Sequence, residues 1–311
     1  MKKYLILLIL VFTMILTSCN EKTNNDTKKL KIMTTLFPQY DFTRQIVKDL
    51  ADVELLLTPG MESHSYDLTP TDVIKILKSD LFIYTGENME TWVQTVIDSL
   101  DNSKVVILDV SKNIELFEIN HLEDHDHEND FVHHEHEVDP HIWTSPKNAK
   151  IMVENILESI VKIDPDNKEY YEKNAADYLK ELDTLDKKIE KIVSTGKRNK
   201  LYFGSRFAFY YFVRDYKLEH VSAYDSCADE AEPSLKVVTD MINEIKKENI
   251  PVIYYQELTG KGISSTISSE TNAKQLLFHS AHNVSKKEFQ DGITYLDIMN
   301  NNLKNLKVGL N

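Results

Sequence analysis

Cysteine, glycine and proline are scarce in this sequence, and basic residues are outnumbered by acidic ones. There are two cysteines, and if the first is modified, as argued below, the second has no partner for an internal disulfide. Eight glycines and eight prolines are too few for a collagen-like or linker-like chain. The 36 lysines and arginines are outnumbered by 50 aspartates and glutamates, so the formal net charge is −14. Such a chain is poorly suited to phosphate backbones, and we expect no nucleic-acid partner, whereas the gathering of cations is compatible with this charge.

The composition is that of a globular protein, 41% hydrophobic and 28% charged, behind an N-terminal targeting segment. Two lysines precede the apolar run Tyr4–Leu16, which is too short for a comfortable membrane span. The LTSC sequence that follows resembles a bacterial lipobox, in which Cys19 carries lipid; the alternative is an ordinary signal peptide with a chance cysteine. We therefore assign residues 1–19 to a lipoprotein signal peptide and 20–29 to a flexible tether. This predicts a protein that is lipid-anchored on the extracytoplasmic face of the cell membrane.

Strand-like and helix-like segments alternate along the rest of the chain, which indicates βα units and parallel sheets. The alternation covers residues 30–145, with a histidine-rich loop at 121–137, and resumes over 197–311. Connecting helices are expected at 146–196. In the second of them, apolar residues recur every three or four positions from Asp166 to about Thr195, as in a solvated helix about 45 Å long. We predict an α/β fold of two lobes with parallel sheets, joined by a long connecting helix.

The first candidate for chemistry is His64, within the stretch PGMESHSYDLTP. It directly follows a predicted strand, and ligands of α/β sheets bind at the carboxyl edge of the strands. A histidine on such a loop can offer neutral imidazole to Zn²⁺, although a single loop histidine is more often only solvated.

The second candidate is His141, within DPHIWTSP. It also precedes a predicted helix, for which Ser145 and Pro146 supply the start signal. Asp139 is placed to accept the other ring N–H of a metal-bound histidine. The alternative is a charged loop next to a buried tryptophan.

The two stretches GMESHSYDLTPTD and DPHIWTSP together resemble the two histidine motifs of the zinc- and manganese-specific solute-binding lipoproteins of ABC transporters. The resemblance extends over essentially the whole mature chain and is greatest with the zinc-binding branch, which has a histidine-rich loop. It implies a metal in the cleft between the lobes, with His64 and His141 as ligands. It also implies an ABC permease and its ATPase as partners, and a protein that is monomeric and does no covalent chemistry.

The sequence departs from this family pattern in the second half. Arg206 stands where the resemblance places a third ligand, and a guanidinium has no lone pair to donate to a metal. We expect it to form a salt bridge instead, with Asp229, Glu230 or Glu232. At the end of the last predicted strand the family has an acid, and the matching segment LLFHSAHN offers two histidines instead.

We predict His279 as the third ligand, with His282 as the second choice; the alternative for His279 is a hydrogen-bonding role near the hinge. Three imidazoles and a water form a reasonable four-coordinate site for Zn²⁺, and they suit zinc better than Mn²⁺, which favours carboxylates. Manganese remains the alternative metal. Cys227, beside an acidic segment, is either a further ligand or a small buried residue.

The acidic tract between the two motifs contains most of the histidines, and it has too few apolar residues to fold on its own. Flexible ligands bind metal weakly and exchange it fast, so this loop is expected to concentrate or sense Zn²⁺; the alternative is a charged insertion without a role. Its histidines are His121, His125, His127, His133, His134 and His136.

Two other classes of function compete with the receptor. A zinc hydrolase is disfavoured because neither H-E-x-x-H nor G-x-S-x-G occurs. A surface adhesin or zinc store would depend on the histidine-rich loop alone. We therefore expect a metal receptor and not an enzyme.

Overall fold

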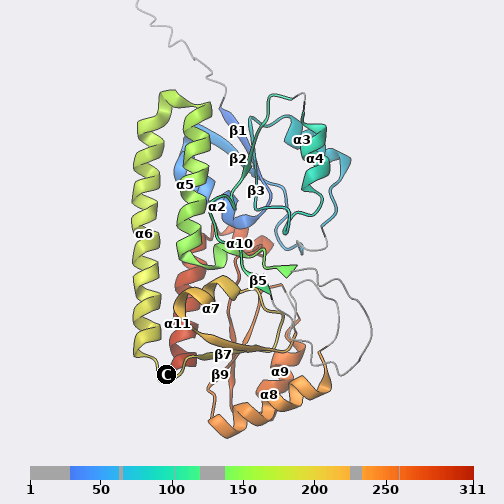
Figure 1. Cartoon of the computed structure of the whole chain (residues 1–311), viewed down its shortest axis with the longest axis vertical. Coiled ribbons are helices and arrows are strands. Elements are labelled where there is room, and N and C mark those ends of the chain that lie inside the picture. Colours follow the sequence, from blue (N-terminus) through green and yellow to red (C-terminus); the bar gives the residue numbers. More distant parts are fainter. Residues whose placement is uncertain (1–28, 63–65, 102, 120–136, 225–232, 259) are drawn as a thin grey trace, which may run out of the picture.

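The computed structural model describes residues 29–62, 66–101, 103–119, 137–224, 233–258 and 260–311. Within these ranges the chain forms two α/β lobes, one above the other in Figure 1, with two long helices along one side. Each lobe has a four-stranded parallel sheet, so the predicted fold class is confirmed. No helix in the described ranges has the length and apolarity needed to cross a membrane.

The sheet of the N-terminal lobe has the strand order β2-β1-β3-β4. One face packs into a core that continues through the long helices, and the opposite face packs on α3 and α4 around Phe82. Thr69 begins α3 as a capping box: its hydroxyl accepts the N–H of Asp72, and the Asp72 carboxylate accepts the N–H of Thr69. The elements are β1 (Leu30–Thr34), α2 (Phe37–Val47), η1 (Lys48–Leu50), β2 (Ala51–Leu55), α3 (Pro70–Leu77), β3 (Leu81–Tyr84), α4 (Val93–Ser99) and β4 (Val106–Asp109).

The sheet of the C-terminal lobe has the order β10-β9-β7-β8 and is also covered on both faces, with α8 and α9 on the side away from the shared core. The alternation of strands and helices that the sequence predicts for this half is present among its described residues. The elements are β7 (Lys200–Phe203), α7 (Tyr210–Tyr216), β8 (Glu219–Ser222), α8 (Leu235–Glu248), β9 (Val252–Tyr255), α9 (Gly262–Glu270), β10 (Lys274–Leu277), α10 (Lys286–Gln290) and α11 (Tyr295–Leu310).

The two lobes are joined by α5 (Pro146–Ile163), the short η3 (Pro165–Asn167) and α6 (Lys168–Thr195). α6 runs the height of both lobes and packs on α5, α2 and α11 (Figure 1). The predicted apolar stripe is confirmed: its last member, Ile192, is partly buried against the core, and the other six are the buried residues of the helix, namely Tyr171, Ala175, Tyr178, Leu182, Leu185 and Ile189. One hydrophobic core therefore extends from the first lobe through these helices into the second.

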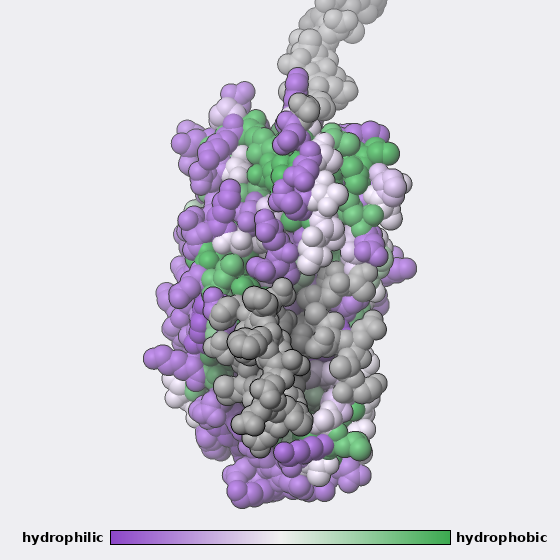
Figure 2. All heavy atoms as spheres, turned by 45° about the vertical axis from the view of Figure 1, so that its right-hand side comes forward, coloured by the Kyte–Doolittle hydropathy of each residue, from purple (hydrophilic) through white to green (hydrophobic). Residues whose placement is uncertain are grey.

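Between the lobes, the ribbon of β5 (Glu118–Ile119) and β6 (Glu137–Val138) and the short η2 (Ile142–Thr144) precede α5. Hydrophilic residues cover most of the described surface in the view of Figure 2, as the acidic composition leads one to expect. The predicted leader, the tether and Cys19 lie outside the described residues, as do the six loop histidines and Cys227.

Candidate metal centre

His141 lies at the junction of the two lobes and is completely buried. The Oδ1 atom of Asp139 is 2.5 Å from its Nδ1 atom and also accepts its backbone N–H at 3.3 Å. Because a carboxylate can only accept, Nδ1 carries the ring proton and Nε2 keeps its lone pair. The predicted role of Asp139 therefore matches the observed geometry: it holds His141 in the tautomer that a metal requires.

The loop that carries His141 is fixed by residues of the C-terminal lobe. The hydroxyl of Tyr211 donates to the Asp139 carbonyl at 2.7 Å, and the hydroxyl of Tyr295 donates to the Trp143 carbonyl at 2.7 Å. At the end of this loop Ser145 caps α5, and Pro146 is the first residue of that helix, as predicted. The imidazole is thus presented by a rigid segment and not by a free loop.

His282 approaches His141 from the other lobe. The two ring centroids are 5.1 Å apart at an interplanar angle of 83°, and the His282 ring is also 5.4 Å from that of Trp143. His282 is 8% exposed. Two imidazoles from opposite halves of the chain therefore meet in a largely dehydrated place, which is where a cation bound between the lobes would gain most from them.

A network of hydrogen bonds holds the segment 279–282 in place. The Glu257 carboxylate accepts the backbone N–H of Ser280 at 2.8 Å and also its hydroxyl. From the other lobe, the indole Nε1–H of Trp143 donates to the Ser280 carbonyl at 2.7 Å. Ala281 adopts a left-handed conformation with φ 60°, which is unusual for a residue with a Cβ and turns the chain sharply before His282.

His279 is used differently. Its Nδ1 accepts the backbone N–H of Ala281 at 2.9 Å, and both its own backbone groups bond to the side chain of Asn302. The same Nδ1 lies 3.5 Å from the Glu257 carboxylate, so a backbone N–H and an acidic oxygen both face this ring nitrogen. The Nε2 atom of His279 is buried without a hydrogen-bond partner among the described residues. His279 and His282 thus both stay predicted ligands, and His282 is the one whose ring faces that of His141.

His64 lies outside the described residues, but both sides of its motif are placed. Before it, the Met61 carbonyl accepts from Asn283, in the same segment as His282. After it, the Tyr66 hydroxyl donates to Asp72 at 2.8 Å. No three His, Cys, Asp or Glu side chains in the described part of the chain form a metal-binding group by themselves.

Two further residues bear on the predicted ligand set. Arg206 lies three residues after the end of β7 and is half-buried. Its predicted partners Asp229, Glu230 and Glu232 lie outside the described residues, so that salt bridge stays a prediction. His220 stacks on Phe207 with ring centroids 3.8 Å apart, and burial lowers its pKa to about 4. His220 is therefore a neutral aromatic packing residue.

Glu90 is a buried acid that sequence reasoning did not single out. Its carboxylate accepts the backbone N–H groups of Thr85 and Gly86 at 3.1 Å and the hydroxyl of Thr35 at 2.5 Å. Burial raises its pKa to about 7, against the lowering effect of these hydrogen bonds. Glu90 therefore stabilises the turn after β3. The only sequence signal for this role is that Glu90 follows shortly after a buried strand.

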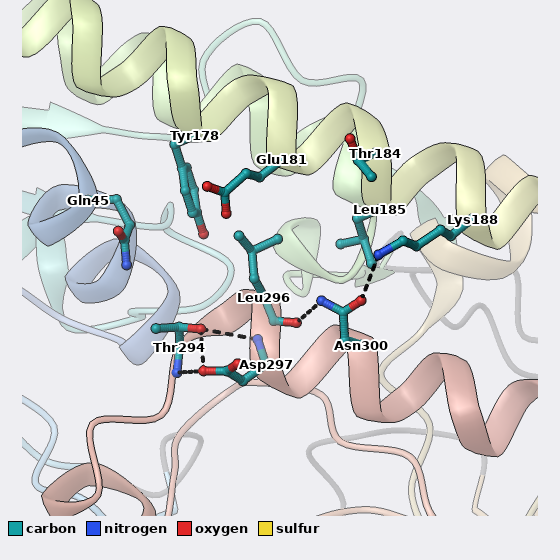
Figure 3. Close-up of a pocket in the computed structure, with 10 residues that line it drawn as sticks. All are labelled: Gln45, Tyr178, Glu181, Thr184, Leu185, Lys188, Thr294, Leu296, Asp297 and Asn300. Carbon is teal, nitrogen blue, oxygen red and sulfur yellow. Dashed lines mark hydrogen bonds between the residues drawn. The ribbon is translucent and has the colours of Figure 1, made fainter.

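Two of the cavities lined by described residues bear on the position of the site. One, of about 190 Å³, lies at the carboxyl edge of β3 and β4 and reaches Asp139 on the side of the metal centre. The other, of about 360 Å³, lies between α2, α6 and α11, with Tyr178, Glu181 and Asp297 around it (Figure 3). The larger cavity shares no lining residue with the His141 and His282 pair, so size alone would have misplaced the site.

Two α/β lobes that share a long helix and bring one histidine each to their junction define a metal-binding solute receptor. Comparison with known families agrees with this class. The model of the family described as zinc-uptake complex component A, periplasmic (ZnuA), matches residues 32–309. The chain belongs to this family, and the resemblance inferred from its two histidine motifs is confirmed.

Individual relatives agree along most of the chain. It is 38% identical over 282 residues to the high-affinity zinc uptake system protein ZnuA of Bacillus subtilis, covering 91% of this chain and 88% of that protein. It is 36% identical over 307 residues to the zinc-binding lipoprotein AdcA of Streptococcus pneumoniae, covering 99% of this chain but only 61% of AdcA.

Solved structures show the same architecture. The Zn(II)-bound ZnuA-like domain of Streptococcus pneumoniae AdcA superposes with a TM-score of 0.76 at 34% identity, covering 91% of this chain and 99% of that one. The metal-dependent lipoprotein YcdH of Bacillus subtilis gives 0.77 at 36% identity with the same coverage.

Proposed function

We propose that this chain is an extracytoplasmic zinc receptor that captures Zn²⁺ and delivers it to an ABC permease coupled to its ATPase. The observation that carries the proposal is the approach of His141 and His282 from opposite lobes, with ring centroids 5.1 Å apart. Membership of the zinc-uptake family supports it, as do relatives that are named zinc-uptake and zinc-binding proteins. The role is binding and transfer without covalent chemistry, as in other transport receptors.

The proposed ligand set is His64, His141 and His282, with water or one further group in the fourth place. His141 is held with its Nε2 lone pair available, and His282 faces it from the other lobe. His64 is proposed from its sequence motif. Imidazole donors suit Zn²⁺ better than Mn²⁺, so zinc is the preferred cargo.

Zinc titration of single variants tests this set. His141→Ala and His282→Ala should each abolish the tight site, because each removes one lobe's donor, and His64→Ala should weaken it strongly. His279→Ala should keep a tight site, although its loop is loosened. A wild-type affinity in His282→Ala, or a tighter site for Mn²⁺ than for Zn²⁺, would contradict the proposal.

We further propose that the histidine-rich loop is auxiliary and that lipid on Cys19 keeps the monomeric receptor at the membrane. Deletion of residues 121–137 should then remove weak, fast-exchanging sites and leave one tight site. Loss of nearly all zinc binding in the deletion would instead favour a zinc store. Cys19→Ser should release the protein from the membrane fraction while zinc binding is kept.

A further inference from the structure

Asn283 follows the proposed ligand His282, and its side chain crosses from one lobe to the other. It is 1% exposed. Its amide Nδ2 donates to the carbonyls of Thr58 and Met61, both at 2.9 Å and both in the N-terminal lobe. Its Oδ1 accepts the backbone N–H of Val284 at 2.8 Å. Both N–H groups and the oxygen of this amide therefore form hydrogen bonds, and these bonds fix the position of the side chain.

The partner segment in the N-terminal lobe is the turn after β2. Its Gly60 has φ 87°, a conformation that glycine adopts without strain, and its N–H donates to the Val284 carbonyl at 2.8 Å. With the two bonds from Asn283, three hydrogen bonds join this turn to residues 283–284. Together with the bond from Trp143 to Ser280, the segment 280–284 is tied to both loops of the N-terminal lobe that carry histidine motifs.

We propose that Asn283 is a positioning residue for zinc capture, which sets the distance between His282 and the ligands of the N-terminal lobe. The inference rests on the proposed function and adds a residue that does not itself touch the metal. Asn283 and His282 are adjacent in the chain, so a shift of Asn283 also shifts the backbone of His282. Asn283 is therefore placed to keep the two lobes in the arrangement that the ion requires.

A purely structural asparagine would have a different signature. It would lower the stability of the fold and leave the zinc affinity of the folded protein alone. A positioning residue changes the zinc dissociation constant and the dissociation rate, because the ligands of the two lobes are no longer held at one separation. The C-terminal lobe offers a matched control in Asn305, whose Nδ2 donates to the Leu277 carbonyl at 2.6 Å within its own lobe.

The experiment compares Asn283→Ala, Asn283→Asp and Asn305→Ala in the full chain, kept in a mild detergent, with Zn²⁺ as the probe. Zinc affinity is measured by competition with a chromophoric chelator, and dissociation by stopped flow. We expect Asn283→Ala to weaken zinc binding by about 10- to 100-fold, the range for groups that orient metal ligands. Asn283→Asp should lose at least as much, because it turns a carboxylate oxygen toward two carbonyls. Asn305→Ala should keep the wild-type affinity.

Hydrogen exchange supplies an independent readout. Without Asn283, the amide of Gly60 should exchange faster in the metal-free protein, since two of the three bonds that hold its turn are lost. Wild-type zinc affinity and dissociation rate in both Asn283 variants would overturn the inference, whatever their stability. That result differs from failure of the proposed function, in which the wild-type chain itself binds no zinc or His282→Ala binds it normally.

Discussion

Replacement of Asp139 by asparagine tests the metal centre without changing its shape. The carboxylate has its Oδ1 2.5 Å from Nδ1 of His141, and its side chain is only 2% exposed. Asparagine can still accept the ring N–H through its amide oxygen, but a neutral acceptor is about half as strong as a charged one. If the amide turns its NH₂ to the ring instead, it favours the tautomer with the proton on Nε2, and Nε2 then has no lone pair for a metal.

The size of the effect follows from this geometry. A hydrogen bond to a charged group contributes about 1.5–3 kcal/mol and a neutral one about 0.5–1.5 kcal/mol, so the weaker acceptor alone costs about 1–1.5 kcal/mol. That corresponds to roughly tenfold in affinity, and the wrong tautomer adds to it. We therefore expect the zinc dissociation constant of Asp139→Asn to rise by about 10- to 100-fold, in the range for such partners.

The assay is competition with a chromophoric chelator at neutral pH. Asp215→Asn is the matched control, because Asp215 accepts a hydrogen bond from Ser145, the residue that caps α5, at the end of the same loop. The control should lower the unfolding temperature and keep the zinc affinity. If Asp139→Asn binds zinc as tightly as wild type, the argument that Asp139 sets the state of His141 is refuted.

Three further predictions concern the surroundings of the site. Trp143→Phe removes the indole donor and leaves the buried Ser280 carbonyl without this hydrogen bond. Zinc affinity should fall, and the unfolding free energy should fall by about 1–3 kcal/mol in urea titrations. Unchanged affinity would mean that the bond is not needed for the site. Because burial raises the pKa of Glu90 to about 7, the folded state binds its proton more tightly, and its contribution to stability is full below pH about 4.5 and is lost as the pH rises toward 7. The unfolding free energy of wild type relative to Glu90→Gln should thus fall by up to about 3 kcal/mol between pH 4.5 and 7, and a flat difference would contradict the raised pKa. Leu182→Ala, in the buried stripe of α6, should cost about 2–5 kcal/mol of stability in the same titrations and leave zinc affinity unchanged; a parallel loss of affinity would show that the stripe also shapes the site.

Much of the fold follows from local patterns. The alternation of strands and helices indicated two parallel sheets. Each strand and helix could be recognised because short-range periodicity and turn residues are enough to identify it. The stripe on α6 was readable for the same reason, since one apolar face recurs at the helical period. The start of α5 at Ser145 and Pro146 is likewise written in two adjacent residues.

The site was only partly readable from sequence. His141 and Asp139 are two residues apart, so their pairing could be anticipated. The placement of His279 and His282 could not, because it depends on the left-handed turn at Ala281 and on bonds to Glu257 and Asn302, which are distant in sequence. The interlobe role of Asn283 was invisible for the same reason: its partners lie more than 220 residues earlier.

The hydrophobic interior that passes unbroken through α5, α6 and α11 has a consequence for how the molecule comes apart. The apolar side chains of each half pack against those of the other half, so an isolated half would expose a hydrophobic surface to water. We expect a single melting transition for the entire chain instead of one for each half.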